Sequence, residues 1–483
     1  MNNELTRKYD TKKLIFGIIG ILTSIIFAYV LETPTGLENA AISVGSDGKA
    51  AMRILGVTML SIVWWIGGVV PDWLTALIML ILFVLVGEVP FSEVFLSYNS
   101  TSVWLIIGAF CISAGVTKTG LFKRISYGLI RIFPSTYKGQ VMALLVIGTI
   151  CSPLIPSSTA KGVLGVSIAS NIATAAGFGK DDNVRIGLVI ASWFGFSLSA
   201  PAFKTGGIVG YTLLGLLSEQ LQSNLSWMKW FIAMIPWLII ILMASYFMIP
   251  LVYKNHSGIK DKTAEKFNLN GIKKLEKMGT YEKLSAIILT LVVIFWVLES
   301  KLGISASITA LIGAVLIFIF NILEPKEIST AVPWSLVIFL GAVLNIGNIF
   351  SKVGLNLWLQ SLLSSFLVNF DNRYALFFVI FVSVILIRFV IVSQAATMVI
   401  MIAVLAPVIE TMGISPFIIG IIVYTTGNCW FTSYQNVMFI PSIASTNNTV
   451  SFSKTLRGCL AYEIINLIAC LACIPYWMFL GYI

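Results

Sequence analysis

Residues 140–175 read QVMALLVIGTICSPLIPSSTAKGVLGVSIASNIATA, an apolar stretch interrupted near its middle by prolines and small polar residues. Pro153 and Pro156 cannot continue a helix, because proline lacks a backbone donor. A polar tip follows at once, Ser157 to Lys161. Non-helical backbone at membrane depth is tolerated only where it is buried in protein or lines a watery cavity. The stretch therefore either crosses once or forms a re-entrant hairpin, and its tip is the first candidate site.

A second stretch has the same design. Residues 374–412 are apolar and are interrupted by the polar tip SQAAT, which begins at Ser393. The rest of the chain contains continuous apolar runs of the length that membrane helices need, about 20 residues. We place these spans at residues 14–31, 54–70, 73–89, 103–117, 186–215, 227–252, 284–299, 304–322, 334–350, 415–446 and 457–482.

The composition supports this layout. Of 483 residues, 58% are apolar and 11% are charged, whereas soluble proteins carry about 25% charged residues. Mean hydropathy is +0.95. These values exclude a soluble enzyme, a disordered chain and a nucleic-acid binder, and continuous apolar runs argue against a β-barrel. We expect an all-α polytopic membrane protein with about 11 transmembrane helices and two re-entrant helical hairpins.

Loop charges set the orientation. With a cytoplasmic N-terminus and two hairpins, 22 of the 31 Lys and Arg residues lie inside and six lie outside. This bias follows the positive-inside rule, favours hairpins over full crossings, and explains the net charge of +10 without nucleic acid. The plasma (inner) membrane is the expected location. The basic N-terminal segment resembles a signal peptide, but no cleavage site follows, so residues 14–31 read as the first membrane helix.

Cysteine and histidine give no sign of a metal or redox site. All six cysteines lie in apolar segments, and we interpret them as packing residues without disulfides. The single histidine, His256, lies in the polar linker 253–283. No cofactor is expected. The eight lysines of this linker either contact lipid headgroups or are simply solvated.

The two halves of the chain share a phrase. Residues 108–121 read GAFCISAGVTKTGL, and residues 341–355 read GAVLNIGNIFSKVGL. In both halves a polar tip follows the phrase at nearly the same spacing. The predicted topology puts Lys118 inside and Lys352 outside, which makes the repeat inverted. Inverted repeats are typical of secondary transporters with a midplane site. We divide the chain into an N-terminal helix and loop (1–52), a first repeat (53–252), a cytoplasmic linker (253–283) and a second repeat (284–483).

Three cations remain inside apolar stretches after the loop cations are assigned: Lys161, Lys204 and Arg388. No carboxylate is expected at the same depth, because Glu410 and Glu463 fall near segment ends. An unpaired cation inside a membrane is costly and usually faces a cavity or a partner. We expect an anionic substrate as that partner. The alternative is that one or more of them extends to the interface.

Polar residues at the breaks complete the predicted site. Helices that resume after the tips point free N–H groups inward, and such ends favour carboxylates. Two opposed tips suit an anion with two ends, such as a dicarboxylate. Spans 186–215 and 415–446 are also broken by Pro and Gly, and they add less specific candidates, among them Tyr434 and Asn447. The predicted substrate-binding residues are Ser157, Ser158, Thr159, Lys161, Lys204, Thr205, Gly206, Arg388, Ser393, Gln394, Thr397, Gln435 and Asn436.

This layout resembles the divalent anion/sodium symporter (DASS) family of dicarboxylate and citrate transporters. The family carries a Ser-Asn-Thr signature at each hairpin tip, which corresponds here to Ser157-Ser158-Thr159 and to the region of Ser393-Gln394-Ala395 with Thr397. The resemblance implies substrate contacts from these tips. It also implies a homodimer in which a transport domain moves both hairpins past a scaffold domain, an elevator mechanism.

Two departures from the family pattern favour its exchanger branch. The signature Asn, which helps to hold Na⁺ in coupled members, is replaced at both tips, and Lys161 and Arg388 bring fixed charge close by. We expect antiport of di- or tricarboxylates without Na⁺; sodium-coupled symport is the main alternative. Transport of another oxyanion, such as sulfate or arsenite, also remains open. A membrane enzyme or a purely structural protein is disfavoured by the absence of catalytic groups at depth and by the buried cations.

Overall fold

The computed structural model describes residues 11–254, 277–367 and 372–483, and this part of the chain contains helices and no strands. The helices of the first half are α1 (Thr11–Ile25), α2 (Thr35–Ser43), α3 (Gly48–Gly67), α4 (Asp72–Leu85), α5 (Phe91–Val94), α6 (Thr101–Lys118), α7 (Leu121–Ile130), α8 (Tyr137–Cys151), α9 (Ser158–Ala175), α10 (Asn183–Trp193), α11 (Ile208–Leu216), α12 (Glu219–Asn224) and α13 (Trp227–Val252).

The second half also contains long and short helices. Its members are α14 (Thr280–Val297), α15 (Glu299–Leu302), α16 (Ala306–Ile319), α17 (Ile328–Ala331), α18 (Trp334–Val343), α19 (Ile346–Lys352), α20 (Leu355–Leu367), α21 (Arg373–Arg388), α22 (Gln394–Thr411), α23 (Pro416–Thr426), α24 (Phe439–Ala444), α25 (Phe452–Ala472) and α26 (Ile474–Phe479).

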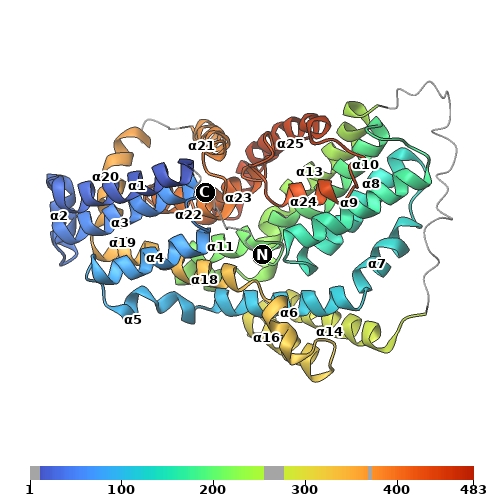
Figure 1. Ribbon diagram of the computed structural model, residues 1–483, viewed down its shortest axis with the longest axis horizontal. Coiled ribbons are helices and arrows are strands. Elements are labelled where there is room, and N and C mark those ends of the chain that lie inside the picture. The colour runs from blue at the N-terminus through green and yellow to red at the C-terminus, as the bar shows by residue number, and fades with distance from the viewer. Residues whose placement is uncertain (1–10, 255–276, 368–371) are drawn as a thin grey trace, which may run out of the picture.

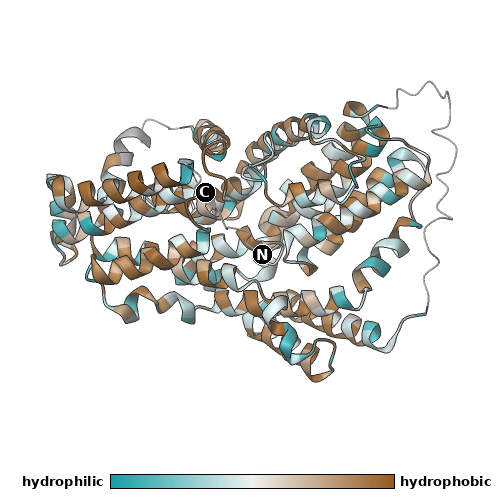
Figure 2. Ribbon diagram, in the orientation of Figure 1, coloured by the Kyte–Doolittle hydropathy of each residue, from teal (hydrophilic) through white to brown (hydrophobic). Residues whose placement is uncertain are grey.

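The predicted membrane character is confirmed. Ten helical segments of the described chain are long and apolar enough to cross a membrane, and α4, α16 and α23 are shorter apolar helices. Hydrophobic residues run along most helices, and hydrophilic residues gather near helix ends and in connecting segments (Figure 2). The predicted breaks are also present: a short 3₁₀ helix (Ser152–Leu154) and residues 155–157 separate α8 from α9, and a short non-helical tip separates α21 from α22. The re-entrant path of these helix pairs stays a prediction.

The helices form two packed groups. In one, α3 packs on α1 and α4, α4 on α18, and α6 on α16 and α14. In the other, α10 packs on α8 and α9, α23 on α21 and α22, and α25 on α13. Figure 1 shows α1 to α5 with α19 and α20 at one end of the molecule, and α7 to α10 with α13 at the other. Both helix pairs with polar tips therefore belong to the second group.

Corresponding helices recur at a nearly constant distance along the chain. Helices α4 and α16 both have 14 residues and begin 234 positions apart, and α9 and α22 both have 18 residues and begin 236 apart. Left-handed residues recur with them: Gly120 with Gly354, and Glu88 with Asn321. A backbone that needs a positive φ at matching places is expected of an internal repeat. These correspondences support the proposed repeat; its inverted orientation stays a prediction.

Two ion pairs join the halves reciprocally. Lys118 of the first phrase pairs with Glu327 at 2.6 Å, and Lys352 of the second phrase pairs with Glu93. The lysines are 234 positions apart, as are the glutamates. The lysine of each half therefore pairs with the glutamate of the other half.

Some sequence-based assignments need correction. Arg185, counted with the loop cations, is 3% exposed. It donates to carbonyls and hydroxyls around the end of α9, including Gly179 O at 2.9 Å. Glu282, assigned to the linker, lies buried in α14 and pairs with Arg124. Glu463 lies inside α25 rather than near the end of a segment, and it is 4% exposed.

The cysteine prediction fits the structure, and His256 lies outside the described residues. All six cysteines are free and buried, as the packing interpretation predicts. The described residues contain no group of three or more His, Cys, Asp or Glu side chains placed to hold a metal ion.

Candidate functional site

The two tips begin their second helices in the same way. The Ser157 hydroxyl accepts a hydrogen bond from Ala160 N at 3.2 Å and caps α9. The Ser393 hydroxyl accepts one from Ala396 N at 3.2 Å and caps α22. Serine is a favourable N-cap because it satisfies one of the free N–H groups of the first turn. Both 18-residue helices therefore direct the positive ends of their dipoles at the tips, as predicted.

Lys161 is fully buried and has protein oxygens as partners. Its amino group donates to Ser152 Oγ at 3.0 Å and to the carbonyl oxygen of Gly206. A neighbouring bond from Thr205 Oγ1 to Pro153 O (3.0 Å) joins the same two segments. Lys161 thus attaches the first tip to the break between α10 and α11. Hydroxyl and carbonyl oxygens of this kind are also the ligands that a hard cation would take.

Arg388 is 1% exposed and is surrounded by backbone carbonyls. Its Nε donates to Gly427 O at 3.1 Å, Nη1 to Ile391 O at 2.7 Å and to Val392 O at 2.6 Å, and Nη2 to Gln435 O. These acceptors come from the second tip and from the break between α23 and α24. One guanidinium therefore satisfies four carbonyls that would otherwise lack partners inside the membrane.

Lys204 has a carboxylate partner, so the expectation that it has none is wrong. Its amino group donates to Leu225 O at 2.7 Å and lies 3.9 Å from Glu299 Oε1. Glu299 also accepts from the backbone amides of Trp227 (2.7 Å) and Ala306 (2.9 Å). The carboxylate therefore connects the starts of α13 and α16 to the first break.

The two breaks meet around Tyr424 of α23. A Cβ placed on Gly207 would lie 2.6 Å from Tyr424 Oη and 3.0 Å from Ser158 Oγ, so only glycine leaves room between the first tip and this tyrosine. The backbone oxygen of Tyr424 accepts from Gln394 Nε2 at 3.2 Å, and the same amide donates to Asn428 Oδ1 at 3.1 Å. The side chain of Tyr424 thus lies near the first tip, at Gly207, and its backbone oxygen binds the second tip through Gln394.

The predicted site residues divide into two kinds. Ser157, Thr159, Ser393 and Gln394 are half-buried at the surface of the tips. Ser158 is buried beside Gly207. The remaining eight are buried and form hydrogen bonds within the protein. Thr205 contacts Pro153 O and Trp227 Nε1, and Gly206 O accepts from Lys161. Thr397 donates to Ser393 O, Gln435 Oε1 accepts from Thr432 N, and Asn436 joins Asn428 O to the start of α24. Direct substrate contact by any of them stays a prediction.

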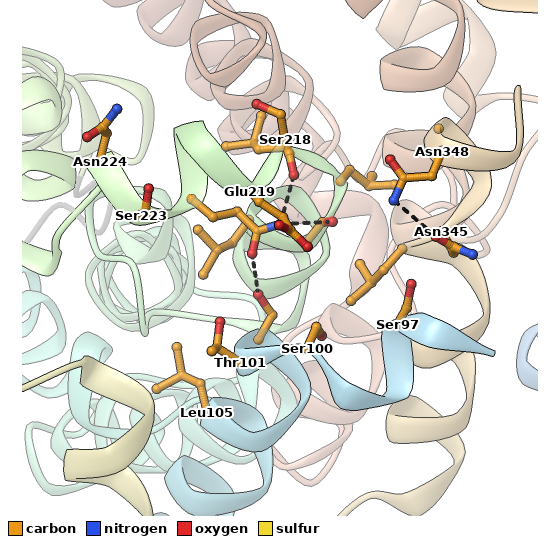
Figure 3. Close-up of a pocket in the computed structure, with 18 of the residues that line it drawn as sticks. Ser97, Ser100, Thr101, Leu105, Ser218, Glu219, Ser223, Asn224, Asn345 and Asn348 are labelled. Atoms are coloured by element: carbon orange, nitrogen blue, oxygen red, sulfur yellow. Dashed lines mark hydrogen bonds between the residues drawn. The ribbon is translucent and has the colours of Figure 1, made fainter. Parts of the chain in front are cut away.

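A cavity of about 1070 Å³ lies beside the first break. Its wall is mixed: serine, threonine and asparagine side chains from the start of α6, from α12 and from α19 lie among apolar side chains (Figure 3). Of the thirteen predicted site residues, all of which are described, Lys204 alone lines it. The lining segments are those that the predicted topology places at the outer face.

A smaller cavity of about 350 Å³ lies along α9 from Ala160 to Asn171 and is also lined by Lys123 and Tyr127 of α7. Ala160 adjoins Lys161, and Lys204, which lines the larger cavity, lies two residues before Gly206. Each cavity is therefore lined by a residue close in sequence to the junction of the first tip with the first break.

Several residues of the site were missed from sequence. Asn428 follows Gly427 in a span already recognised as broken, so a signal for it existed. Tyr424 lies in a continuous apolar run and gives no such signal. Glu299 lies 95 positions after Lys204, and this separation hides the ion pair from any inspection of sequence.

Comparison with known proteins agrees with the geometry. A family model described as the sodium:sulfate symporter transmembrane region matches residues 19–483. The chain belongs to this family of divalent anion/sodium symporters. The family assignment made from the two tips is thereby confirmed.

Relatives and solved structures agree with this assignment. The chain is 25% identical to the inner membrane protein YbhI of Escherichia coli (68% of this chain, 69% of that one) and to dicarboxylate transporter 1, chloroplastic, of Spinacia oleracea (71% and 59%). It is 24% identical to the citrate/succinate antiporter of Escherichia coli (57% of each). It shares its fold with Alcanivorax borkumensis YdaH (TM-score 0.54, 13% identity, 80% and 86% covered) and Neisseria gonorrhoeae MtrF (0.56, 14%, 97% and 94%).

Proposed function

We propose that this protein is a secondary transporter that exchanges di- and tricarboxylates, of the succinate, malate, 2-oxoglutarate and citrate class, independently of Na⁺. The names of the spinach and Escherichia coli relatives support a carboxylate substrate. These two relatives are named as a transporter and an antiporter and not as enzymes, which supports transport without chemistry. The proposed location is the plasma (inner) membrane, with a cytoplasmic N-terminus.

The oxygen ligands around Lys161 and Arg388 carry the antiport proposal. At each tip, a buried side-chain cation binds carbonyl or hydroxyl oxygens that join the tip to a helix break. A mobile Na⁺ would seek the same oxygens. Because the charge is covalently fixed, it stays when the substrate leaves, and an empty site is then costly to move through the membrane. Exchange of one anion for another avoids this cost.

The two cavities support alternating access at the first tip. The larger cavity reaches Lys204 and the smaller reaches Ala160, so each is lined by a residue close in sequence to the tip-to-break junction. The helix pairs with polar tips pack in one group, and α3, α4, α6 and α16 pack in the other. We propose that the group with the polar tips moves as the transport domain of an elevator past the other group, the scaffold, in a homodimer embedded in lipid.

Sodium-coupled symport is the second candidate, and the family description itself names sodium. Under that alternative, Na⁺ binds at oxygens other than those occupied by Lys161 and Arg388. Another oxyanion, sulfate included, is a third candidate, since helix N-termini bind sulfate as readily as carboxylate.

Counterflow in proteoliposomes tests the proposal. Purified protein is reconstituted into vesicles loaded with succinate, 2-oxoglutarate, citrate or sulfate, and uptake of external radiolabelled succinate is followed. We expect rapid uptake into vesicles that contain a carboxylate and background uptake into empty vesicles. Uptake into empty vesicles driven by a Na⁺ gradient would contradict exchange, and preference for internal sulfate would contradict the substrate class.

A further inference from the structure

Glu463 is a buried carboxyl group in the middle of α25. It is 4% exposed, and neither of its oxygens makes a hydrogen bond among the described residues. The ion pairs of these residues do not include it. The Asn466 side chain lies beside the carboxyl group as a donor, but the described residues place no cation there. A carboxylate in this position is costly, so at neutral pH the group is neutral and carries a proton.

The surroundings of Glu463 offer no compensating charge. On α25 the ionisable groups coupled to it are Cys459, Tyr462 and Cys470, and across from it lies Cys429. The nearest amide side chain is Asn466. The helices packed on α25 bring Arg388 of α21, Arg185 of α10, Tyr424 of α23 and Tyr253 after α13. Arg388, Arg185 and Tyr253 form hydrogen bonds with backbone groups elsewhere.

The helix face that carries Glu463 holds the second break in place. Tyr462 Oη donates to Thr425 O at 2.8 Å, and Cys459 Sγ accepts from Trp430 N at 3.1 Å. Asn466, one turn further along α25, lies 3.5 Å from Thr426 Oγ1. Glu463 is therefore flanked by the contacts that fix residues 425–430.

The same segment anchors the second tip. Gly427 O accepts from Arg388, and Asn428 accepts from Gln394. Ionisation of Glu463 would draw water or donors toward α25 and would displace the segment that both tip residues bind. The proton on Glu463 and the geometry of the second tip are thus physically coupled.

We propose that Glu463 is an intramembrane proton-binding site whose occupancy holds the second tip and the second break in their substrate-binding arrangement. Exchange is then favoured at acid pH and is lost at alkaline pH as the proton dissociates. This coupling to exchange rests on the proposed transport function, whereas the neutral state of the group does not.

The first test is the pH profile of succinate counterflow. Above about pH 7 both carboxyls of succinate are ionised, so the profile is followed from there to about pH 10 without titration of the substrate. Wild-type exchange should fall with rising pH over this range, because loss of one proton changes the active fraction by up to about tenfold per pH unit. E463Q, which mimics the protonated group, should vary by less than about twofold. Glu32→Gln, which alters an exposed carboxyl, should keep the wild-type profile.

Thermal unfolding of the detergent-purified proteins supplies a readout independent of substrate. The melting midpoint of the wild type should fall over the same pH range, and that of E463Q should not. Parallel profiles for wild type and E463Q, a flat wild-type profile, or failure of E463Q to insert would each overturn the proposal. If the wild type exchanges no carboxylate at any pH, the transport proposal fails, and the melting profiles alone still decide whether Glu463 holds the proton.

Discussion

The two tips share a frame and differ in the side chain that secures them. Each begins its second helix with a serine cap of the same length, 3.2 Å. The first tip is held by Lys161, which follows the cap and binds one carbonyl and one hydroxyl. The second is held by Arg388, which precedes the cap and binds four carbonyls. The comparison shows that a fixed cation can hold a tip whether it precedes or follows the serine cap. The guanidinium of arginine binds more carbonyls than the amino group of lysine does.

Removal of Arg388 should have the largest effect. Arg388→Ala leaves four buried carbonyls without partners, and each lost charge-assisted bond is worth about 1.5–3 kcal/mol. We expect exchange to fall by more than about 100-fold, since about 1.4 kcal/mol is tenfold. Arg388→Lys keeps the charge but not the planar guanidinium, so its exchange rate should lie between those of the wild type and Arg388→Ala. Counterflow at equal protein density measures this, and wild-type rates in Arg388→Ala would show that the second tip does not need its cation.

Removal of Lys161 should have a smaller effect. Lys161→Ala leaves two oxygens without their donor, Gly206 O and Ser152 Oγ, whereas Arg388→Ala leaves four. We therefore expect the exchange rate to fall by about tenfold to 100-fold. Added Na⁺ should restore part of the rate, because these oxygens suit a small cation. Lys180→Ala, at an exposed loop lysine, is the matched control and should behave as wild type. A loss as large as that of Arg388→Ala would mean that the two tips are equivalent.

Gly207→Ala probes the place where the first tip meets Tyr424. The new Cβ would lie 2.6 Å from Tyr424 Oη, so tip and tyrosine must separate by a fraction of an ångström. We expect a roughly tenfold loss of exchange with little change in insertion, since a small misplacement at a site is costly. Gly128→Ala meets open space and serves as the control. Equal rates in both variants would refute a role for this junction in transport.

The smallest effect is expected at the base of the first helix pair. Burial acts to raise the pKa of Asp181, but hydrogen bonds from the side chain and backbone of Ser451, together with Lys180 and Lys454, hold that pKa below its usual value. A depressed pKa contributes stability that is present above the unfolded pKa and is lost as pH falls through the folded one. Asp181→Asn should lower stability at neutral pH by about 1 kcal/mol or less, because the group is partly exposed and solvent weakens its interactions.

Thermal unfolding in detergent measures this effect. The difference between Asp181→Asn and wild type should shrink toward zero as the pH is lowered below the folded pKa of Asp181. A difference that persists in acid would show that the contact stabilises through something other than ionisation.

The sequence predicts local features of this protein well. Apolar run lengths predict the spans, and prolines with small polar residues predict both tips, because helix formation and helix breaking are local properties. The buried positions of Lys161 and Arg388 follow from the same runs. Their partners do not, because backbone carbonyls give no signal in a sequence.

Side-chain partnerships across the fold escape prediction for a related reason. Arg185 was counted as a loop cation, yet the packed end of α9 buries it. Glu299 and Lys204 meet only after α10, α13 and α16 are assembled, and Glu463 becomes isolated only once α25 packs on the second break. Tyr424 joins the two halves of the site although the apolar run that it ends gives no sign of this role.

The dependence of succinate counterflow on Na⁺ tests most directly the claim that fixed cations take the place of sodium. Proteoliposomes containing wild-type protein and internal succinate are assayed with Na⁺ or with choline on both sides. We predict that replacement of Na⁺ leaves the wild-type rate within about twofold and lowers the residual rate of Lys161→Ala. A wild-type rate that disappears without Na⁺ would contradict the claim.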